Sequence, residues 1–240
     1  MANILGTVND DFLVGGAEDD YILGDDGNDT IFAGAGSDTI GGQAGNDTMY
    51  GQGGNDSFWD TMGDNWISGG DGNDYIVTGA GNDTLYGNND DDYLNAGSGD
   101  DHVHGGNGDD VIRDVLGYND ISGGQGSDRI EFSASSHRVY GGVLGQSGDG
   151  YSDEFVLSSW HANDDLTNIG QVGDVIGDFE VGIDILNLAE LGIQASHVTI
   201  STYDNGYMVN IDTGVNELSV GLRTGPEVLT MSDIVFAPTA

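Results

Sequence analysis

A nine-residue pattern runs without insertion or deletion from residue 6 to residue 140, and it limits the possible folds more than any other feature of this chain. It gives fifteen units, and the eighth position is apolar in all of them. The sixth position is aspartate at Asp11, Asp20, Asp29, Asp38, Asp47, Asp56, Asp74, Asp83, Asp92, Asp101, Asp110 and Asp128. The fourth position is glycine in eleven units, nine of which also have a sixth-position aspartate: Gly27, Gly36, Gly45, Gly54, Gly72, Gly81, Gly99, Gly108 and Gly126. Because three columns keep their chemistry over fifteen units, the chain is a repeat array.

Each unit can be translated into a backbone shape. Positions seven to nine carry β-branched and aromatic residues around the apolar eighth residue, which predicts a three-residue strand with one side chain pointing inward. Positions one to six are rich in glycine, asparagine and aspartate, which predicts a turn. Two units then form one coil of 18 residues. Successive coils are expected to stack as parallel strands around a thin core, because one unit cannot bury its apolar residue alone.

The charge of the chain narrows the classes of partner. There are 42 acidic residues against four basic ones, and the formal net charge is -38. Because phosphate contacts require positive charge, this balance excludes nucleic acid as a direct partner and argues against anionic membrane surfaces. The chain has no cysteine, so it has no disulfide or thiolate metal site. We expect no N-terminal secretory signal peptide, because the first residues have no positively charged region followed by an apolar stretch. We also expect no membrane span, since no apolar run approaches about 20 residues.

The units closest to the pattern, such as the one that contains Gly72, Asp74 and Ile76, resemble the RTX, or haemolysin-type calcium-binding, repeat family of secreted bacterial proteins. The resemblance implies that several Ca²⁺ ions lie between turns two units apart. It also implies that the ligands are the sixth-position aspartates and turn carbonyls, including that of the fourth-position glycine. The chemistry agrees, because Ca²⁺ takes six to eight oxygen ligands. Zinc would prefer histidine or thiolate, which these turns lack apart from His137.

Stacking of the coils would bring like charges together. Neighbouring parallel strands lie about 5 Å apart, so aspartates one coil apart should face each other at that spacing. Two like charges at such a distance repel by about 1 kcal/mol even in water. Without a cation between them the columns repel, and we therefore expect folding and calcium binding to be a single event.

The coil divides the turns between two edges that differ in sequence. The unbroken edge has aspartate at every sixth position from Asp20 to Asp128, whereas the interrupted edge has Asn65 and Asn119 and ends at His137. Asparagine offers only a neutral carbonyl, so we expect ions beside these two residues to be weaker or missing. Neutral drift in a redundant array is an alternative explanation that the sequence leaves open.

The repeat ends at residue 140, which divides the chain into a calcium-binding roll, residues 1–140, and a C-terminal region, residues 141–240. Segments of the second region resemble the C-terminal end of serralysin-type repeat domains, without the protease: residues 152–157, 174–179 and 182–188. Three further segments predict antiparallel strands that cover the open end of the roll: residues 197–203, 207–211 and 216–222. Asp233, followed by three apolar residues, resembles the uncleaved signal for type I (ABC-transporter) secretion machinery.

Two surface features of the roll could carry a further function. His102 and His104 point outward from one strand and could hold zinc or copper, although such pairs are commonly inert. An aromatic ladder shares the ninth position of one sheet, with Ser68 as an interruption and Tyr140 three coils later: Phe32, Tyr50 and Tyr86. These rings could stack on sugars, or they could stack on one another and stabilise the sheet.

Taken together, these features predict an all-β fold, a right-handed parallel β-roll capped by a C-terminal antiparallel sheet or sandwich region. No serine elbow and no His-Glu-x-x-His motif is present, so we expect no enzyme. The expected function is that of a secreted calcium-binding repeat protein with a cell-surface, matrix or adhesive role. The alternative is a polysaccharide-binding module associated with secreted carbohydrate-active enzymes. The expected partners are calcium, the export machinery, and an extracellular polysaccharide or cell surface.

Overall fold

The fold is seen in a computed structural model that covers most of the chain. The described residues are 1–114, 116–133, 137–142, 150–157, 175–177, 179, 184–191, 194–203, 206–212, 217–223 and 229–236. Parts of the segments 174–179 and 182–188 and the last four residues therefore lie outside the description. Within the described residues, no helix is long and apolar enough to cross a membrane.

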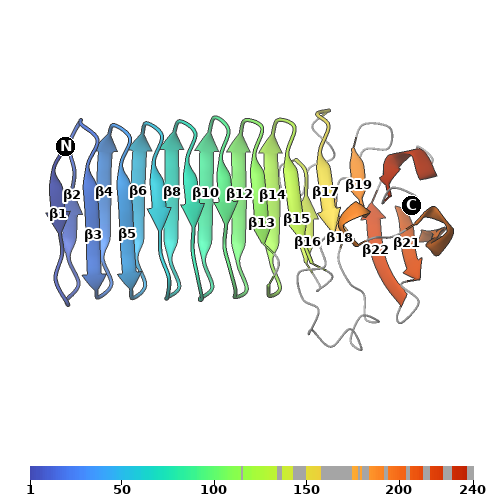
Figure 1. The fold of residues 1–240 in the computed structure, drawn as a ribbon, viewed down its shortest axis with the longest axis horizontal. Coiled ribbons are helices and arrows are strands. Elements are labelled where there is room, and N and C mark those ends of the chain that lie inside the picture. Colours follow the sequence, from blue (N-terminus) through green and yellow to red (C-terminus); the bar gives the residue numbers. More distant parts are fainter. Residues whose placement is uncertain are drawn as a thin grey trace.

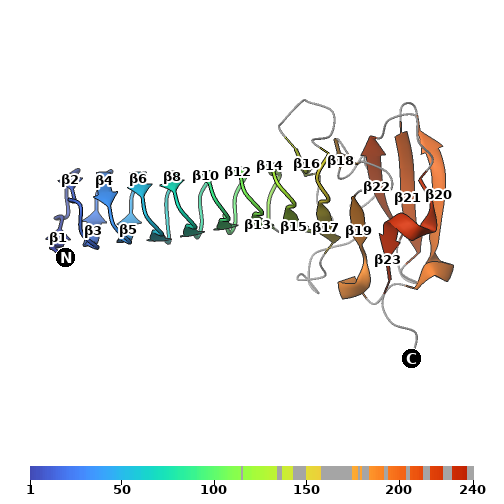
Figure 2. The same ribbon diagram turned by 90° about the horizontal axis from the view of Figure 1, so that it is seen from above.

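The strands alternate between two long sheets, as a coil of two units requires (Figure 1). In the described residues one sheet has 11 strands, in the order β1 (Asn3–Leu5), β3 (Tyr21–Asp26), β5 (Thr39–Ala44), β7 (Ser57–Trp59), β9 (Tyr75–Val77), β11 (Tyr93–Asn95), β13 (Val111–Asp114), β15 (Arg129–Phe132), β17 (Glu154–Leu157), β19 (Ile185–Asn187) and β23 (Ile234–Val235). The other has 12, in the order β2 (Phe12–Val14), β4 (Thr30–Ala35), β6 (Thr48–Gly53), β8 (Trp66–Asp71), β10 (Thr84–Asn89), β12 (His102–Asn107), β14 (Asp120–Gln125), β16 (Arg138–Tyr140), β18 (Val175–Ile176), β22 (Glu217–Arg223), β21 (Gly206–Asp212) and β20 (Val198–Tyr203). The two sheets form thin facing layers (Figure 2). The predicted parallel β-roll is confirmed.

The register of the stack is one coil, or 18 residues. In β10 and β12, for example, Leu85 pairs in parallel with Val103. Most strands of the 12-stranded sheet are six residues long rather than the predicted three, because pairing continues into positions one to three of the next unit. Thus Phe32 pairs with Tyr50, and Gly34 still pairs with Gln52. The tight turn begins only at the fourth position.

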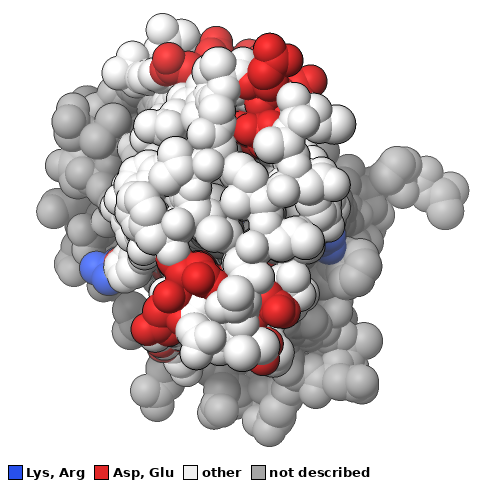
Figure 3. Space-filling view, turned by 90° about the vertical axis from the view of Figure 1, so that its left-hand side faces the viewer, with Lys and Arg blue, Asp and Glu red and all other residues white. Residues whose placement is uncertain are grey.

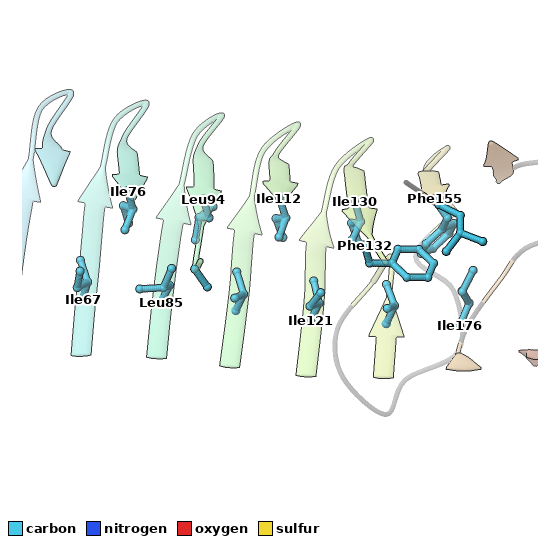
Figure 4. Packing of buried hydrophobic residues seen from close by; sticks show 14 of the residues in the cluster. Ile67, Ile76, Leu85, Leu94, Ile112, Ile121, Ile130, Phe132, Phe155 and Ile176 are labelled. Carbon is cyan, nitrogen blue, oxygen red and sulfur yellow. The ribbon is translucent and has the colours of Figure 1, made fainter. Parts of the chain in front are cut away.

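The core is a single layer of eighth-position side chains from the two sheets. Ile67 of β8 and Ile76 of β9 are both fully buried, and they point into the space between the sheets (Figure 4). The same burial holds for almost every eighth-position residue, and only Leu13 of the first coil reaches 9% exposure. Because each coil contributes only a few such side chains, its stability depends on the coils on either side.

The stack continues beyond Tyr140 and is then closed by antiparallel strands. β17 pairs in parallel with β15, β19 with β17, and β23 with β19. In the other sheet β18 pairs in parallel with β22, which begins an antiparallel set with β21 and β20. This set lies at the C-terminal end of the roll (Figures 1 and 2). Val209 and Val220 of the set are buried and join the core. The predicted antiparallel cap is confirmed.

The fourth-position glycines are required by both conformation and space. Gly45 has φ +137°, and a Cβ on it would lie 1.8 Å from the carbonyl oxygen of Gly27 in the preceding coil. A positive φ is shared by all eleven of these residues: Gly27, Gly36, Gly45, Gly54, Gly63, Gly72, Gly81, Gly99, Gly108, Gly117 and Gly126. Side chains at this position would force the stacked turns apart.

We predict that Gly45→Ala lowers the free energy of unfolding by more than about 1 kcal/mol, because alanine is strained at this φ and meets a backbone oxygen. Gly53→Ala is the matched control, since a Cβ on Gly53 has no atom within 4 Å. The control should change stability by less than about 0.5 kcal/mol. Urea unfolding in saturating calcium measures both variants. Equal midpoints would contradict this explanation of the fourth position.

Candidate metal centre

The acidic side chains gather at the two turn edges of the roll. Viewed along the stack from the N-terminal end, they lie at the top and bottom of the molecule, with a neutral band between them (Figure 3). Three arginines pair with acidic side chains that project from the sheets: Arg113 with Glu131, Arg129 with Glu154, and Arg138 with Asp120. These arginines thus neutralise charge on the sheet faces, while the turn edges carry the concentrated negative charge.

The sixth-position side chains form a ladder along each edge. From Asp20 to Asp128 the carboxylates are at most 5% exposed. The backbone N–H of Asp56 donates to Oδ1 of Asp74 in the next coil at 2.8 Å. The same bond is donated by Asp11, Asp20, Asp29, Asp38, Asp74, Asp83, Asp92, Asp101, Asp110 and Asp128. Asparagine serves equally well here, because Oδ1 of Asn65 accepts from the N–H of Asp47 at 2.9 Å. The ladder therefore uses one oxygen of each side chain.

The second oxygen of most of these carboxylates has no hydrogen-bond partner. Nine sixth-position aspartates within the described part of the chain have a buried Oδ2 in this condition: Asp29, Asp38, Asp47, Asp56, Asp74, Asp83, Asp92, Asp101 and Asp110. The first coil differs, because Oδ2 of Asp11 accepts from the N–H of Thr7 at 2.6 Å and Oδ2 of Asp20 from that of Gly16 at 3.0 Å. A buried, ionised and unpartnered oxygen is strongly destabilising unless a cation binds it.

Backbone carbonyls lie beside these oxygens. A Cβ placed on the first-position residue Gly51 would lie 2.2 Å from Oδ2 of Asp56 and 2.5 Å from the carbonyl oxygen of Gly69. The same arrangement recurs at Gly87, where the corresponding carbonyl belongs to Gly105 and would lie 2.6 Å away. The first glycine is therefore needed because oxygen atoms occupy the place of its side chain. These oxygens, one charged and one neutral, form part of a possible cation site.

The donor set fits calcium better than a transition metal. Within the described residues, no three histidine or acidic side chains gather at one point. A cation at the turns would therefore take most of its ligands from backbone carbonyls and a minority from carboxylates. Ca²⁺, with its flexible shell of six to eight oxygens, accepts such a mixture.

Burial changes the ionisation of the column. It raises the pKa of Asp92 to about 8. It raises the pKa to about 7 for Asp56, Asp74, Asp101 and Asp110. For Asp56 the loss of hydration is the main cause of the higher pKa; the N–H of Asp38 opposes it, and the charge of Asp38 adds to it. Without a cation, the folded protein therefore resists ionising these groups at neutral pH.

A comparison with known families supports the same assignment. The family model of the RTX calcium-binding nonapeptide repeat (4 copies) matches residues 5–40, 41–59, 53–85, 86–113 and 104–134. These segments together span more than half of the chain. The chain belongs to the RTX calcium-binding repeat family. A search of curated proteins found no match. The RTX roll is a structural calcium-binding fold, so the repeats are calcium-binding, while the individual ligands named above stay predictions.

The interrupted edge of the RTX roll ends in a neutral group. His137 is 1% exposed, and burial lowers its pKa to about 4. The neutral ring lies with Nδ1 3.3 Å from the backbone N of Asn119, so it can accept the ladder hydrogen bond. His137 thus replaces the sixth-position oxygen of an RTX unit in the ladder without adding charge to the column.

Two sets of residues in the ladders were not identified from the sequence. Fifth-position side chains form an outer ladder of the opposite direction; for example, Oδ1 of Asn28 accepts from the N–H of Asn46 at 2.8 Å. The prevalence of asparagine, aspartate and serine at this position was the available signal. Asp153 and Asp184 also extend the unbroken edge. Oδ1 of Asp153 accepts from the backbone N–H of Asp128 at 2.9 Å, and Oδ1 of Asp184 accepts from that of Asp153 at 3.0 Å. They lie 25 and 31 residues after the preceding ladder residue, so they fall outside the nine-residue pattern.

The two surface features have different outcomes. The His102 ring is 66% exposed, with Nδ1 3.7 Å from Oδ2 of Asp120. The His104 ring lies edge-on to Tyr86, with the ring centroids 6.1 Å apart. As noted above, no cluster of three metal-binding side chains includes these histidines among the described residues. A zinc or copper site at this pair therefore stays a prediction without further support.

The aromatic ladder is longer and more continuous than expected. Trp66, at the seventh position, fills the gap left by Ser68, with centroids 4.8 Å from Tyr50 and 5.7 Å from Tyr86. Phe32 and Tyr50 stack in parallel at 4.6 Å. Phe12 and His104 extend the row at its two ends. Tyr140 instead packs against backbone, because a Cβ on Gly177 would lie 2.1 Å from its ring.

We predict that calcium-free protein gains β-structure as the pH falls from about 8 to about 5. Unfolded aspartate has a pKa near 3.9, so between that value and about 7 to 8 the folded state binds more protons than the unfolded state. Stability without calcium therefore rises as the pH falls through the folded pKa values. Far-ultraviolet circular dichroism in excess chelator measures the change.

A salt control separates this effect from general charge repulsion. At pH 8, about 1 M salt screens exposed charges beyond about 3 Å but does not rehydrate buried carboxylates. Salt should therefore restore less structure than acid does. An unchanged or weaker β signal at pH 5 would show that the buried aspartates do not control the stability of the calcium-free protein.

Proposed function

We propose that this chain is a secreted RTX protein that folds when it binds extracellular calcium and acts, without catalysis, at a cell surface or in an extracellular matrix. The observation that supports this most directly is the column of buried carboxylates, most of which have one oxygen in the ladder and one without a partner. The columns occupy both edges and hence nearly every coil. A cation required by nearly every coil would be part of the fold itself.

The physical argument for coupled folding has two parts. Burial and the charge of the neighbouring aspartate both oppose ionisation, as the raised pKa of Asp74 shows. The ligands of one site come from coils that meet only in the stacked roll, so the unfolded chain has no assembled site. The free energy of calcium binding then contributes directly to folding. The net charge of -38 further opposes a compact state without cations.

We predict a steep gain of β-sheet circular dichroism on calcium titration at pH 7.5, between about 0.1 mM and several millimolar, the range of extracellular calcium modules. Magnesium at equal concentration should be less effective, because it requires near-octahedral geometry and gives up water reluctantly. Sedimentation velocity should show compaction over the same calcium range. A full β-sheet spectrum in excess chelator at this pH would refute the coupling of folding to calcium.

The position of the export signal is consistent with this order of events. Asp233 and Ile234 are 7% and 4% exposed in the folded protein. Oδ2 of Asp233 accepts from the N–H and Oγ1 of Thr230, and Ile234 begins the last strand of the stack. If this segment is the signal, a type I transporter can read it only in the unfolded chain. A low calcium concentration inside the cell would keep the chain in that state.

Polysaccharide binding is a second candidate function, and the row of rings on the 12-stranded sheet supports it. The row runs across successive coils, a shape that suits a linear polymer. Another row lies on the other sheet, where Trp59 is 51% exposed and contacts Tyr75 at 5.2 Å. The close parallel stacking of Phe32 on Tyr50 favours the purely structural role, because each ring covers a face of the other.

We predict that, if the rings bind glycans, replacing Tyr50 and Trp66 by serine abolishes binding on a glycan array probed in calcium. The calcium concentration at the midpoint of folding should stay close to that of the unaltered protein, because the double variant keeps the core and the turns intact. Phe132→Leu, a fully buried change, serves as the control that should retain binding. No binding by the unaltered protein, together with lower stability of the double variant, would assign the rings to sheet stabilisation alone.

A further inference from the structure

The two asparagine units share a second departure from the repeat. Among the fifteen units, only those with Asn65 and Asn119 at the sixth position have aspartate at the first, namely Asp60 and Asp114. Elsewhere the first position is mostly glycine, which leaves room for the sixth-position carboxylate of its own unit. In both units, asparagine at the sixth position occurs together with aspartate at the first, which points to a shared physical cause.

The asparagines keep the ladder but lose the charge. Oδ1 of Asn65 accepts the N–H of Asp47 as an aspartate would, and its Nδ2 donates to the carbonyl oxygen of Gly63 at 3.1 Å. Oδ1 of Asn119 likewise accepts from Asp101 at 2.9 Å. The amide group therefore offers a hydrogen-bond donor where other units offer a carboxylate oxygen. In these two units the sixth position therefore supplies no negative charge for a cation.

Asp60 adds a buried carboxylate to the same edge, beside Asp47 in the preceding coil. It is 4% exposed, its Oδ1 accepts from the N–H of Thr61 and of Met62, and its Oδ2 has no partner. A Cβ on Gly42 would lie 2.3 Å from Oδ2 of Asp60 and 2.1 Å from Oδ2 of Asp47. In other coils a carboxylate oxygen and a backbone carbonyl meet at the equivalent point. Here two buried carboxylate oxygens without donors converge on it.

Asp114 is a second buried acid at the first position, three coils later. It is fully buried, and neither of its oxygens has a hydrogen bond of acceptable geometry. The charges of Asp101 and Asp83, on the same edge, act on it and raise its pKa further above the effect of burial. Two independent occurrences of a buried acid at this position argue against a chance substitution.

We infer that Asp60 and Asp114 are calcium ligands that replace, from the first position, the carboxylates missing at Asn65 and Asn119. The inference rests on the proposed calcium-binding function. It gives every coil of the interrupted edge from Asp11 to Asp114 one carboxylate, and so replaces the expectation that the asparagine coils bind weakly or not at all. The alternative is a pair of carboxyl groups that share a proton and bind no ion.

The test counts bound ions. Equilibrium dialysis against ⁴⁵Ca²⁺ at saturating concentration, with folding checked by circular dichroism, compares the full chain with Asp60→Asn and Asp114→Asn. Each variant should bind one ion fewer and need several-fold more calcium to fold. The matched controls are Asp64→Asn and Asp100→Asn, exposed acids in neighbouring turn positions whose Oδ1 atoms accept backbone bonds that asparagine preserves. They should keep the ion number of the full chain.

A rescue variant keeps the test decisive if a single variant fails to fold. Asp60→Gly combined with Asn65→Asp returns the unit to the consensus, and it should recover the ion number and the calcium midpoint. Unchanged stoichiometry and midpoint in Asp60→Asn, or fewer ions in the double variant than in the full chain, would overturn the inference. A full chain that binds no calcium at all would instead refute the proposed function, so the two failures are distinguishable.

Discussion

Parallel stacking in an 18-residue register places every residue directly above its equivalent in the next coil, and the rest of the structure depends on this constraint. Equivalent apolar side chains then stack into a continuous core, which is favourable. Identical carboxylates stack in the same way, which is unfavourable because like charges are held close together away from water. The apolar core therefore stabilises the roll, whereas the acidic edges destabilise it unless cations bind there.

In the turns, the two oxygens of most sixth-position aspartates have different roles: Oδ1 accepts a backbone hydrogen bond, and Oδ2 is left for a cation. Oδ1 of Asp74 accepts a backbone N–H and fixes the side chain, so the position of Oδ2 is determined by the fold rather than by rotamer freedom. Glycine at the first position leaves the space that Oδ2 requires, and glycine at the fourth allows the close approach of successive turns. An aspartate thus contributes to the ladder and to the candidate cation site at the same time.

The interrupted edge shows that the two roles can be separated. Asn65 performs the ladder role alone, and Asp60 carries the charge from a different position of the same unit. Departures from a repeat consensus are therefore better judged in pairs than singly. The flat faces differ from the edges. There, stacking across coils produces rows of aromatic rings and pairs of opposite charge, such as Arg138 with Asp120, which stabilise the sheets without a cation.

The sequence alone determined the roll, because an apolar residue every nine positions and glycine-rich turns have few other packed solutions. It also identified the twelve sixth-position aspartates, since their regular spacing can be seen in the sequence itself. What it could not show was the direction of each side chain. The unpartnered Oδ2 atoms, the convergence of Asp60 on Asp47, and the place of Asp153 and Asp184 in the unbroken edge depend on which coils lie side by side. Longer spacings of 25 and 31 residues interrupt the spacing of nine but not the stack, because the register is held by hydrogen bonds between strands and not by distance along the chain.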